Sequence, residues 1–164
     1  MFVVLYELSQ IIKKQKVIVM IRILEISTLN TFPIRLEVLR KNIPLPYEFN
    51  GDFDSETFHL GAFKDDELIA VSSYMKASNS NFEGNQYQLR GMATLTEYQG
   101  SGVGKLMLQQ AFLILKERNT KVLWCNARIA AVDFYKKQGF QTFGEKFEIS
   151  HVGEHYVMFK ELNS

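Results

Sequence analysis

The chain has 164 residues, 46% of them hydrophobic, and a single cysteine, Cys125. This length and apolar content suit one globular domain with a substantial core. The formal net charge of +1 gives no electrostatic reason to expect nucleic acid or an anionic membrane as a partner. One cysteine excludes an internal disulfide framework and a cysteine-rich metal site, which makes a reducing cytoplasm the simplest compartment.

Residues 1–16 combine an apolar first half with lysines that come after it. A secretory signal places its positive charges first, so secretion is disfavoured. Charged residues also interrupt every apolar window before the ~20 residues that a membrane span needs. Residues 1–19 could be an amphipathic helix packed on the domain, a dimer contact or a dispensable leader with Met20 as the true start. We favour the dispensable leader, with residues 20–164 as a single domain.

The first strand and helix are predicted over residues 17–40. Residues 17–26 are β-branched and apolar, which favours a strand. A helix should then run to about Arg40, with Thr28 or Asn30 as its cap and Pro33 in its first turn, where a missing N–H costs nothing.

A loop follows at residues 43–55, which contain two prolines, a glycine and several acids. The acids Glu48, Asp52 and Asp54 could contact a cationic amine. A solvated loop surface is the better interpretation of all three.

The rest of the chain alternates between strands and helices. Two strands joined by an acidic turn predict a hairpin, and a third strand follows. The predicted elements are strands at 57–63, 68–76 and 89–95, a helix at 102–118, a strand at 121–126, a helix at 129–138, and strands at 142–147 and 155–161. Antiparallel strands followed by a β-α-β unit indicate an α+β fold, with a mixed, mostly antiparallel sheet and helices on its faces.

Residues 88–108 form the most informative stretch, read as a strand, a glycine-rich turn and a helix. The turn contains Gly100, Gly102 and Gly104. Glycine lets the backbone approach a ligand closely and adopt positive φ. The first turn of a helix adds unpaired N–H groups and a partial positive charge. Together these features predict a site for phosphate or pyrophosphate.

Spacing separates the kinds of phosphate-binding loop. The ATP-type loop needs four residues between its first glycine and Gly-Lys, followed by Ser or Thr. Only three residues separate Gly100 from Gly104 here, and Leu106 follows Lys105. The dinucleotide fingerprint would place a third glycine where Lys105 stands. Both motifs fit poorly.

Residues 99–104 fit instead the Q/R-x-x-G-x-G/A turn with which N-acetyltransferases of the GNAT superfamily hold the pyrophosphate of coenzyme A. Residues 123–140 resemble the second half of that signature: a strand, then a short helix with alanine and tyrosine, ended by Gly-Phe. The resemblance covers nearly all of residues 20–162, and residues 124–128 and the C-terminal segment resemble a subgroup of small uncharacterised acetyltransferases. It implies the three-layer GNAT fold, in which the central strands are splayed apart.

The resemblance also implies a set of site residues. Tyr135 would lie near the sulfur of coenzyme A and act as the general acid that protonates the departing thiolate. Backbone N–H groups of residues 92–94 would contact the pantetheine and the oxyanion, and Gly91 is consistent with a bulge that turns an N–H out of the ladder. The implied cofactor-binding residues are Met92, Ala93, Thr94, Gln99, Gly100, Ser101, Gly102, Val103, Gly104, Lys105, Asn126, Phe134 and Lys137.

Three positions depart from the common family pattern. Many members have proline where Thr96 stands, arginine where Gln99 stands, and asparagine where Arg128 stands. Gln99 can still donate a hydrogen bond to a phosphate, although without a charge. Arg128 has no role that the pattern explains.

The general base is left open by the sequence. His155 could be a base or a substrate contact. Glu83 and Glu97 are expected to be solvated, and His59 to be structural. His151 and His155 are four residues apart, which on a helix would suggest a metal site, but their surroundings predict a turn and a strand. We therefore expect no metal, and we expect Cys125 to be a buried thiol.

Two functions from different classes follow. The first is an acetyltransferase that moves an acetyl group from acetyl-coenzyme A to a primary amine by direct attack in a ternary complex. The second is a non-catalytic module that binds coenzyme A or regulates a partner. The intact turn and tyrosine favour the enzyme. The acceptor depends on loops at 43–56, 77–85 and 148–155, which carry no signature, and both a monomer and a homodimer stay open.

Overall fold

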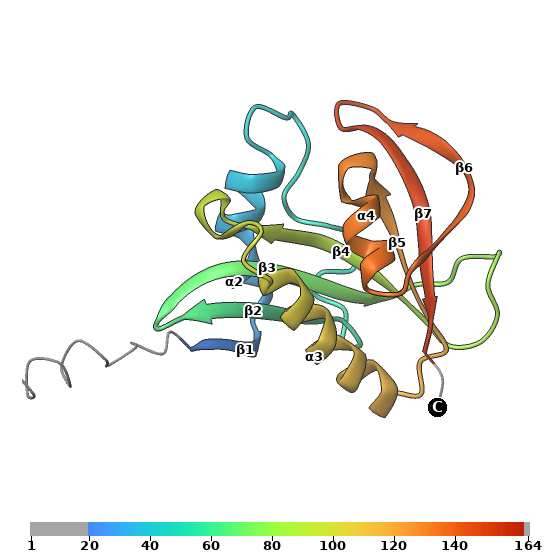
Figure 1. The fold of residues 1–164 in the computed structure, drawn as a ribbon, viewed down its shortest axis with the longest axis horizontal. Helices are drawn as coiled ribbons and strands as arrows, with labels where there is room; N and C mark the ends of the chain where they lie inside the picture. The colour runs from blue at the N-terminus through green and yellow to red at the C-terminus, as the bar shows by residue number, and fades with distance from the viewer. Residues whose placement is uncertain (1–19, 163–164) are drawn as a thin grey trace, which may run out of the picture.

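The computed structural model describes residues 20–162, so the predicted extension at 1–19 lies outside the described residues. The helices and strands are drawn in Figure 1. In chain order they are β1 (Ile21–Ile26), α2 (Thr28–Ile34), the π-helical turn η1 (Arg35–Leu39), β2 (Phe58–Lys64), β3 (Glu67–Lys76), β4 (Gln86–Thr94), the 3₁₀ turn η2 (Thr96–Tyr98), α3 (Val103–Glu117), β5 (Val122–Arg128), the 3₁₀ turn η3 (Ile129–Ala131), α4 (Val132–Lys137), β6 (Gln141–Ile149) and β7 (Gly153–Glu161).

The strands form one seven-stranded sheet in the order β1-β2-β3-β4-β5-β7-β6. The neighbours β4 and β5 pair in parallel, and α3 connects them as the crossover helix. All the other neighbouring strands pair antiparallel. The prediction of an α+β fold with a mostly antiparallel mixed sheet and a central β-α-β unit is therefore confirmed.

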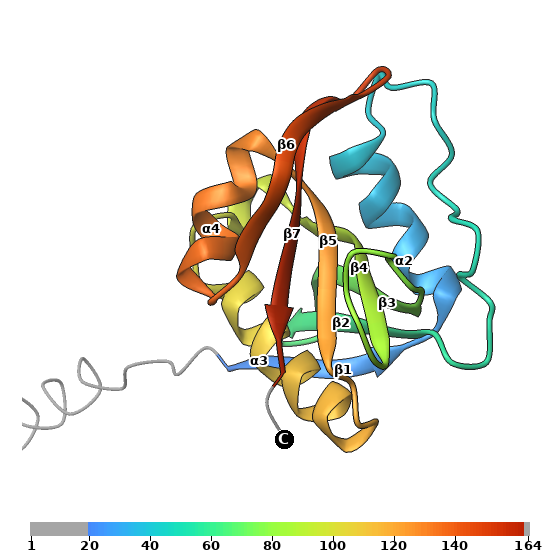
Figure 2. The same ribbon diagram turned by 90° about the vertical axis from the view of Figure 1, so that its right-hand side faces the viewer.

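Helices cover both faces of the sheet. Figure 2 shows α4 on one side of the central strands and α2 on the other. The larger core lies under α3 and α4, where fully buried side chains such as Leu108 and Leu123 meet Tyr74 of β3. A smaller core lies under α2 and η1 and contains Ile34, Val71 and Ala93. Within residues 20–162 no helix is long and apolar enough to cross a membrane.

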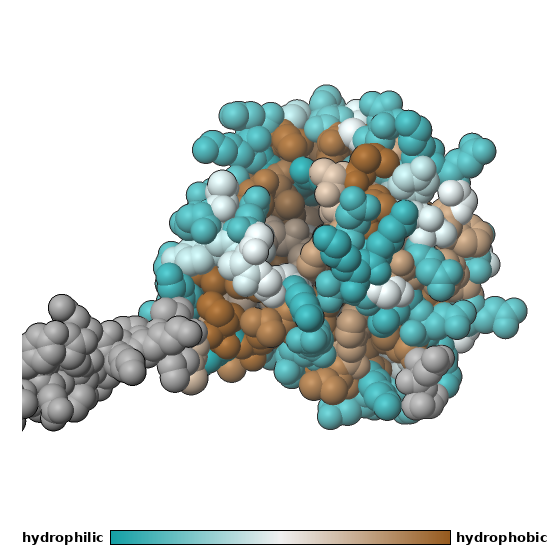
Figure 3. Space-filling model, in the orientation of Figure 1, coloured by the Kyte–Doolittle hydropathy of each residue, from teal (hydrophilic) through white to brown (hydrophobic). Residues whose placement is uncertain are grey.

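The two central parallel strands separate partway along their length. Pairing extends from Gln86 opposite Val122 to Leu89 opposite Cys125, and β4 then diverges from β5. The divergence begins at the bulge of β4 predicted at Gly91, where the register against β3 shifts and φ is 59°. A left-handed backbone at this point explains the glycine. Figure 3, in the orientation of Figure 1, shows a hollow with apolar walls between α2 and α4.

Two local predictions differ from the structure. The first strand was predicted over 17–26, but within the described residues it begins at Ile21. The first helix begins at Thr28, with Ser27 before it and no side-chain cap, so Pro33 lies inside the helix and not in its first turn. Because Pro33 has no N–H to donate, the regular hydrogen-bond ladder is interrupted there, and the chain continues as the π-helical turn η1.

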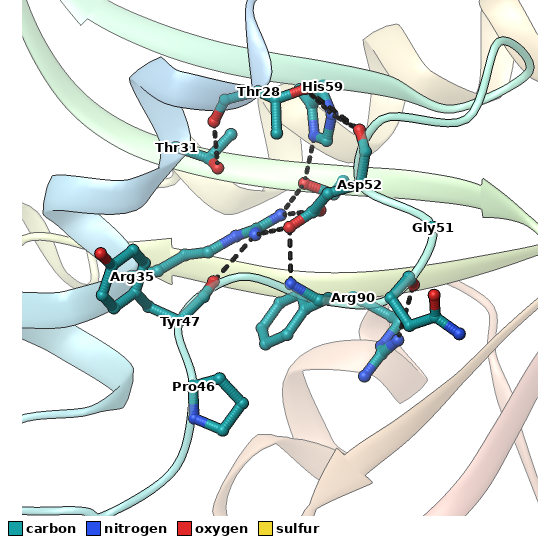
Figure 4. Close-up of polar contacts among 12 residues, drawn as sticks. Thr28, Thr31, Arg35, Pro46, Tyr47, Gly51, Asp52, His59 and Arg90 are labelled. Carbon is teal, nitrogen blue, oxygen red and sulfur yellow. Dashed lines mark hydrogen bonds and ion pairs between the residues drawn. The ribbon is translucent and has the colours of Figure 1, made fainter.

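A buried ion pair joins η1 to the loop before β2 (Figure 4). The Arg35 guanidinium forms two hydrogen bonds to the Asp52 carboxylate, at 2.7 and 2.9 Å, and both side chains are fully buried. Arg35 also donates to the Ser73 hydroxyl of β3 at 2.6 Å and to the Tyr47 carbonyl at 3.0 Å. One arginine therefore ties the helix, the loop and the sheet together.

The environment of Asp52 corrects the prediction that the loop acids are solvated. Glu48 and Asp54 are exposed as predicted, but Asp52 is 2% exposed. Besides Arg35, its carboxylate accepts a hydrogen bond from the Phe49 N–H at 2.7 Å. The loop composition alone did not reveal this, because the partner of Asp52 is distant in the sequence.

We expect Asp52→Asn to destabilise the protein strongly. The substitution leaves the Arg35 charge buried without a counter-charge, which typically costs about 3–5 kcal/mol. Urea unfolding followed by circular dichroism would measure the free energy of unfolding. The matched control is Asp66→Asn, which removes the carboxylate of an exposed pair with Arg22 and should leave stability nearly unchanged. Equal stability of the two variants would contradict the structural role of the buried pair.

Candidate active site

The glycine turn before α3 presents bare backbone to the surroundings. Gly100 and Gly102 have φ of 75° and 87°, and a Cβ built on either would meet no atom within 4 Å. Gly102 is the N-cap of α3 and provides no side-chain hydrogen bond to the first turn. The first N–H groups of the helix are therefore available to a ligand, and an anion is favoured there.

Gly104 has a different role in the same turn. A Cβ at this position would lie 3.1 Å from the Phe134 ring of α4 and 3.3 Å from the Met92 methyl group of β4. The start of α3 thus approaches α4 closely across the gap between β4 and β5. A larger residue would push these two helices apart.

A cavity of about 590 Å³ opens where β4 and β5 diverge. Its walls come from both strands, η1, the loop after η1, α4 and the turn between β6 and β7. The cavity brings together five residues predicted from the sequence: Met92, Gln99, Asn126, Tyr135 and His155.

Tyr135 lies on α4 and is 7% exposed. Its hydroxyl donates to the Met92 sulfur at 3.6 Å. Burial raises the pKa of Tyr135 well above its ordinary value, so the phenol stays protonated at neutral pH. A thioether is a weak acceptor, and the proton can therefore be offered to a stronger base that enters the cavity.

The edge of β4 that faces the gap carries backbone polar groups. Leu95 donates its N–H to the Ile69 carbonyl of β3, at 2.9 Å. Since successive N–H groups alternate between the two edges of a strand, the N–H of Thr94 points the other way, toward the gap. The Thr94 carbonyl accepts a hydrogen bond from the Gln99 side chain at 3.0 Å, which ties the glycine turn to the end of β4.

Other predicted cofactor residues lie outside the cavity wall. The Ala93 side chain is buried in the core under α2, and Lys137 is exposed in the last turn of α4. Ser101 is exposed and its hydroxyl donates to the Tyr98 carbonyl. Lys105 is exposed in the first turn of α3, next to the bare N–H groups of the turn.

The histidines occupy three different environments. His155 is 4% exposed on β7, lines the cavity, and its Nδ1 is 2.7 Å from the Gly153 carbonyl. His151 is exposed in the preceding turn. His59 is buried between the Ser73 hydroxyl and the Asp52 carbonyl, where burial lowers its pKa, in keeping with the predicted structural role.

No metal site is apparent within residues 20–162, where no group of three or more His, Cys, Asp or Glu could hold an ion. Cys125 is 2% exposed, as predicted for a buried thiol. Burial raises its pKa, so it stays protonated and is not an activated nucleophile.

The sequence did not single out Arg40, Phe49 or Arg90 as site residues. All three line the cavity beside Arg128, whose position in the sequence had no explanation. Arg40 directly follows η1 as its C-cap, Phe49 lies in the loop, and Arg90 lies on β4 just before the bulge. A periodic pattern identifies buried faces, but it does not say which arginines from separate elements will meet.

Comparisons with known proteins identify the same fold and family. The model of the acetyltransferase (GNAT) family matches residues 22–140. An uncharacterised N-acetyltransferase of Bacillus subtilis (strain 168), YitI, is 35% identical over 147 residues, covering 88% of this chain and 99% of that protein.

Solved structures with low sequence identity share the fold. ElaA of Escherichia coli is 18% identical with a TM-score of 0.73, covering 87% of this chain and 100% of that one. An acyl-CoA N-acyltransferase of Pseudomonas aeruginosa is 17% identical with a TM-score of 0.70, covering 86% and 99%. Together with the family match and the close relative, the splayed sheet and the glycine turn lead to one conclusion: this chain belongs to the GNAT family of acetyltransferases.

Proposed function

We propose that the protein transfers an acetyl group from acetyl-coenzyme A to a primary amine by direct attack in a ternary complex. Membership of the GNAT family implies acyl-coenzyme-A-dependent N-acetylation. The observation that carries the finer proposal is the cavity at the gap between β4 and β5. It runs from Gln99 beside the glycine turn to Tyr135, and on to the loop and the β6–β7 turn.

The turn offers what a pyrophosphate needs. The open space above Gly100 and Gly102 admits the phosphates, and the first N–H groups of α3 provide donors together with the positive end of the helix dipole. The Lys105 side chain in the same turn of the helix adds a positive charge. The pantetheine then extends along the unpaired edge of β4 toward Tyr135.

The reaction in this proposal begins when the neutral amine nitrogen attacks the thioester carbonyl carbon. A C–N bond forms and the carbonyl π electrons move to oxygen, where an N–H of the free β4 edge stabilises the negative charge. The C–S bond then breaks, and the sulfur takes its proton from the Tyr135 hydroxyl. The raised pKa of Tyr135 keeps the hydroxyl protonated at the start of this step, so it has a proton to donate to the sulfur.

His155 is the proposed proton acceptor for the amine. A carbonyl can only accept, so Nδ1 must donate to the Gly153 carbonyl. With its proton on Nδ1, the neutral imidazole keeps a free lone pair on Nε2. The ring lies in the wall of the same cavity as Tyr135. Once the neutral amine has added to the carbonyl, its nitrogen is positively charged, and Nε2 takes the proton that this nitrogen loses as the amide forms; exchange with water then restores the protons of Tyr135 and His155.

The Tyr135→Phe variant should lower kcat by about 10²-fold or more, because the thiolate must leave without a proton donor. The affinity for coenzyme A should change little, since Phe keeps the ring and its packing against Phe134 and Phe140. Thiol release measured with a panel of amines gives the rate.

The pH dependence tests whether Tyr135 acts in its protonated form. Because the pKa of Tyr135 is raised, the phenol is protonated throughout the range from about pH 6 to about pH 9. The ratio of wild-type to Tyr135→Phe rates should therefore be constant across that range. A variant as active as the wild type would exclude the acid role.

The Gly102→Glu variant should weaken binding of coenzyme A by about 100-fold or more, because a carboxylate would occupy the space of the phosphates and repel them. The matched control is Gly144→Glu on β6. Gly144 also has positive φ, at 66°, and open space around its Cβ, so both variants carry similar backbone strain.

Calorimetric titration of coenzyme A into each variant measures the difference. Equal, wild-type affinity in both variants would exclude the turn as the pyrophosphate site. Tight binding without any turnover by the wild type would instead favour a non-catalytic coenzyme A module.

A further inference from the structure

Three arginines from separate elements line one part of the cavity: Arg40 at the end of η1, Arg90 on β4 and Arg128 at the end of β5. Each is partly buried. Among residues 20–162, none of the three forms an ion pair with an acidic side chain. The neighbouring Arg35 is different, because Asp52 neutralises it.

The guanidinium groups of Arg40 and Arg90 are held in place by neutral partners. Arg40 donates to the carbonyls of Pro46 and Leu39, at 2.8 and 3.0 Å. Both guanidiniums lie over the Phe49 ring, with their central carbons 5.4 and 4.6 Å from its centroid. The side chains are therefore oriented before a ligand binds, which reduces the entropy lost on binding.

Among the described residues, no acidic side chain forms an ion pair with the three arginines to balance their charges. Burial lowers the pKa of Arg40, and the positive charges of Arg128, Arg35 and Arg90 lower it further. Burial also lowers the pKa of Arg90; the charge of the nearby Asp52 raises it, and the charge of Arg35 lowers it again. Arginine keeps its proton in proteins, so the result is a concentration of positive charge that an anion would relieve.

The pyrophosphate of coenzyme A does not account for this anion site. Leu89 and Cys125 point into the core under α3 and α4. Since side chains alternate along a strand, Arg90 and Arg128 point to the opposite face, where η1 carries Arg40. The glycine turn opens α3, on the other face of the sheet. The arginines therefore lie on the side from which an acceptor would reach the thioester.

One acidic residue among those lining the cavity has a complementary position. Glu48 lies in the loop next to Phe49 and is exposed. It forms no ion pair with Arg40, Arg90 or Arg128, since no such contact within 4 Å occurs among residues 20–162. Its carboxylate is available to an ammonium group, while the arginines are available to an anion.

From this arrangement we infer that the acceptor is a small primary amine that also carries a carboxylate, which Arg40, Arg90 and Arg128 bind while Glu48 attracts the ammonium group. The inference rests on the proposed acetyltransferase function and specifies its acceptor. Guanidinium groups bind carboxylates with paired, charge-assisted hydrogen bonds, and three of them on separate elements also define the direction of the amine relative to the thioester.

The test uses matched acceptors that differ in the carboxylate. L-Phenylalanine and L-leucine are compared with their C-terminal amides, by thiol release from acetyl-coenzyme A. We expect at least one acid to have a kcat/KM about tenfold or more above that of its amide, as loss of a charge-assisted hydrogen bond would produce. Binding of the same pairs to the protein saturated with coenzyme A is measured in parallel by the shift of Tm.

Arginine variants assign the preference to the site. Arg40→Gln and Arg128→Gln should raise KM for the preferred acid by about tenfold or more while leaving kcat/KM for its amide unchanged. Arg40→Lys should restore part of the loss because it keeps the charge. The matched control is Arg22→Gln on β1, outside the cavity, where the guanidinium contacts Asp66 and the Asp65 carbonyl.

The outcomes distinguish the two proposals. Amides that are acetylated and bound as well as their acids, or an acid preference that survives both glutamine variants, would overturn the carboxylate site and leave the acetyltransferase intact. The carboxylate site would also be overturned if neither turnover nor binding showed a preference for any acid over its amide. Failure of the protein to bind coenzyme A at all, measured separately by calorimetry, would overturn the proposed function itself.

Discussion

The ion pair between Arg35 and Asp52 supports the geometry of the whole cavity. It connects η1, the loop and β3 at the point where β4 bulges. A Cβ at Gly91 would lie 2.8 Å from Arg35 Nε and 2.7 Å from the Phe49 ring, so the glycine is required for the strand to pass this close. The bulge, the buried arginine and the aromatic ring form one packed unit, and β4 leaves β5 at this unit.

The same unit joins the two halves of the site. The Phe49 ring centroid lies 4.2 Å from the central guanidinium carbon of Arg35 and 4.6 Å from that of Arg90. Arg35, which is paired with Asp52, and Arg90, which has no ion-pair partner among the described residues, therefore contact the same ring. On the other face of the sheet, the bulge leads into Met92, which accepts the Tyr135 hydroxyl. In the proposed function, cofactor chemistry and acceptor recognition therefore lie on opposite faces of one short stretch of β4. Burying the charges of Arg35 and Asp52 costs free energy, and the two hydrogen bonds between them offset that cost.

The local sequence predicted most elements because their causes are local. The glycine spacing identified the turn and the start of α3, and the Gly91 bulge followed from one glycine within a strand. Predictions failed at one helix boundary and in one place where the cause was distant. Pro33 lies inside its helix because the chain enters the helix early, at Thr28. Asp52 is buried because Arg35 meets it, and no pattern within a loop of mixed acids reveals that partner.

The sequence by itself determined the fold class, the glycine turn before α3 and the place of the tyrosine on the short helix. Each depends on residues close together in the chain, where period, spacing and the conformational freedom of glycine act directly. The tertiary structure decided which side chains share the cavity. Arg40, Arg90 and Arg128 come from three elements, and only the packing of η1 across the diverging strands brings their charges together. Electrostatic interactions depend on distance in space, and the sequence does not specify those distances.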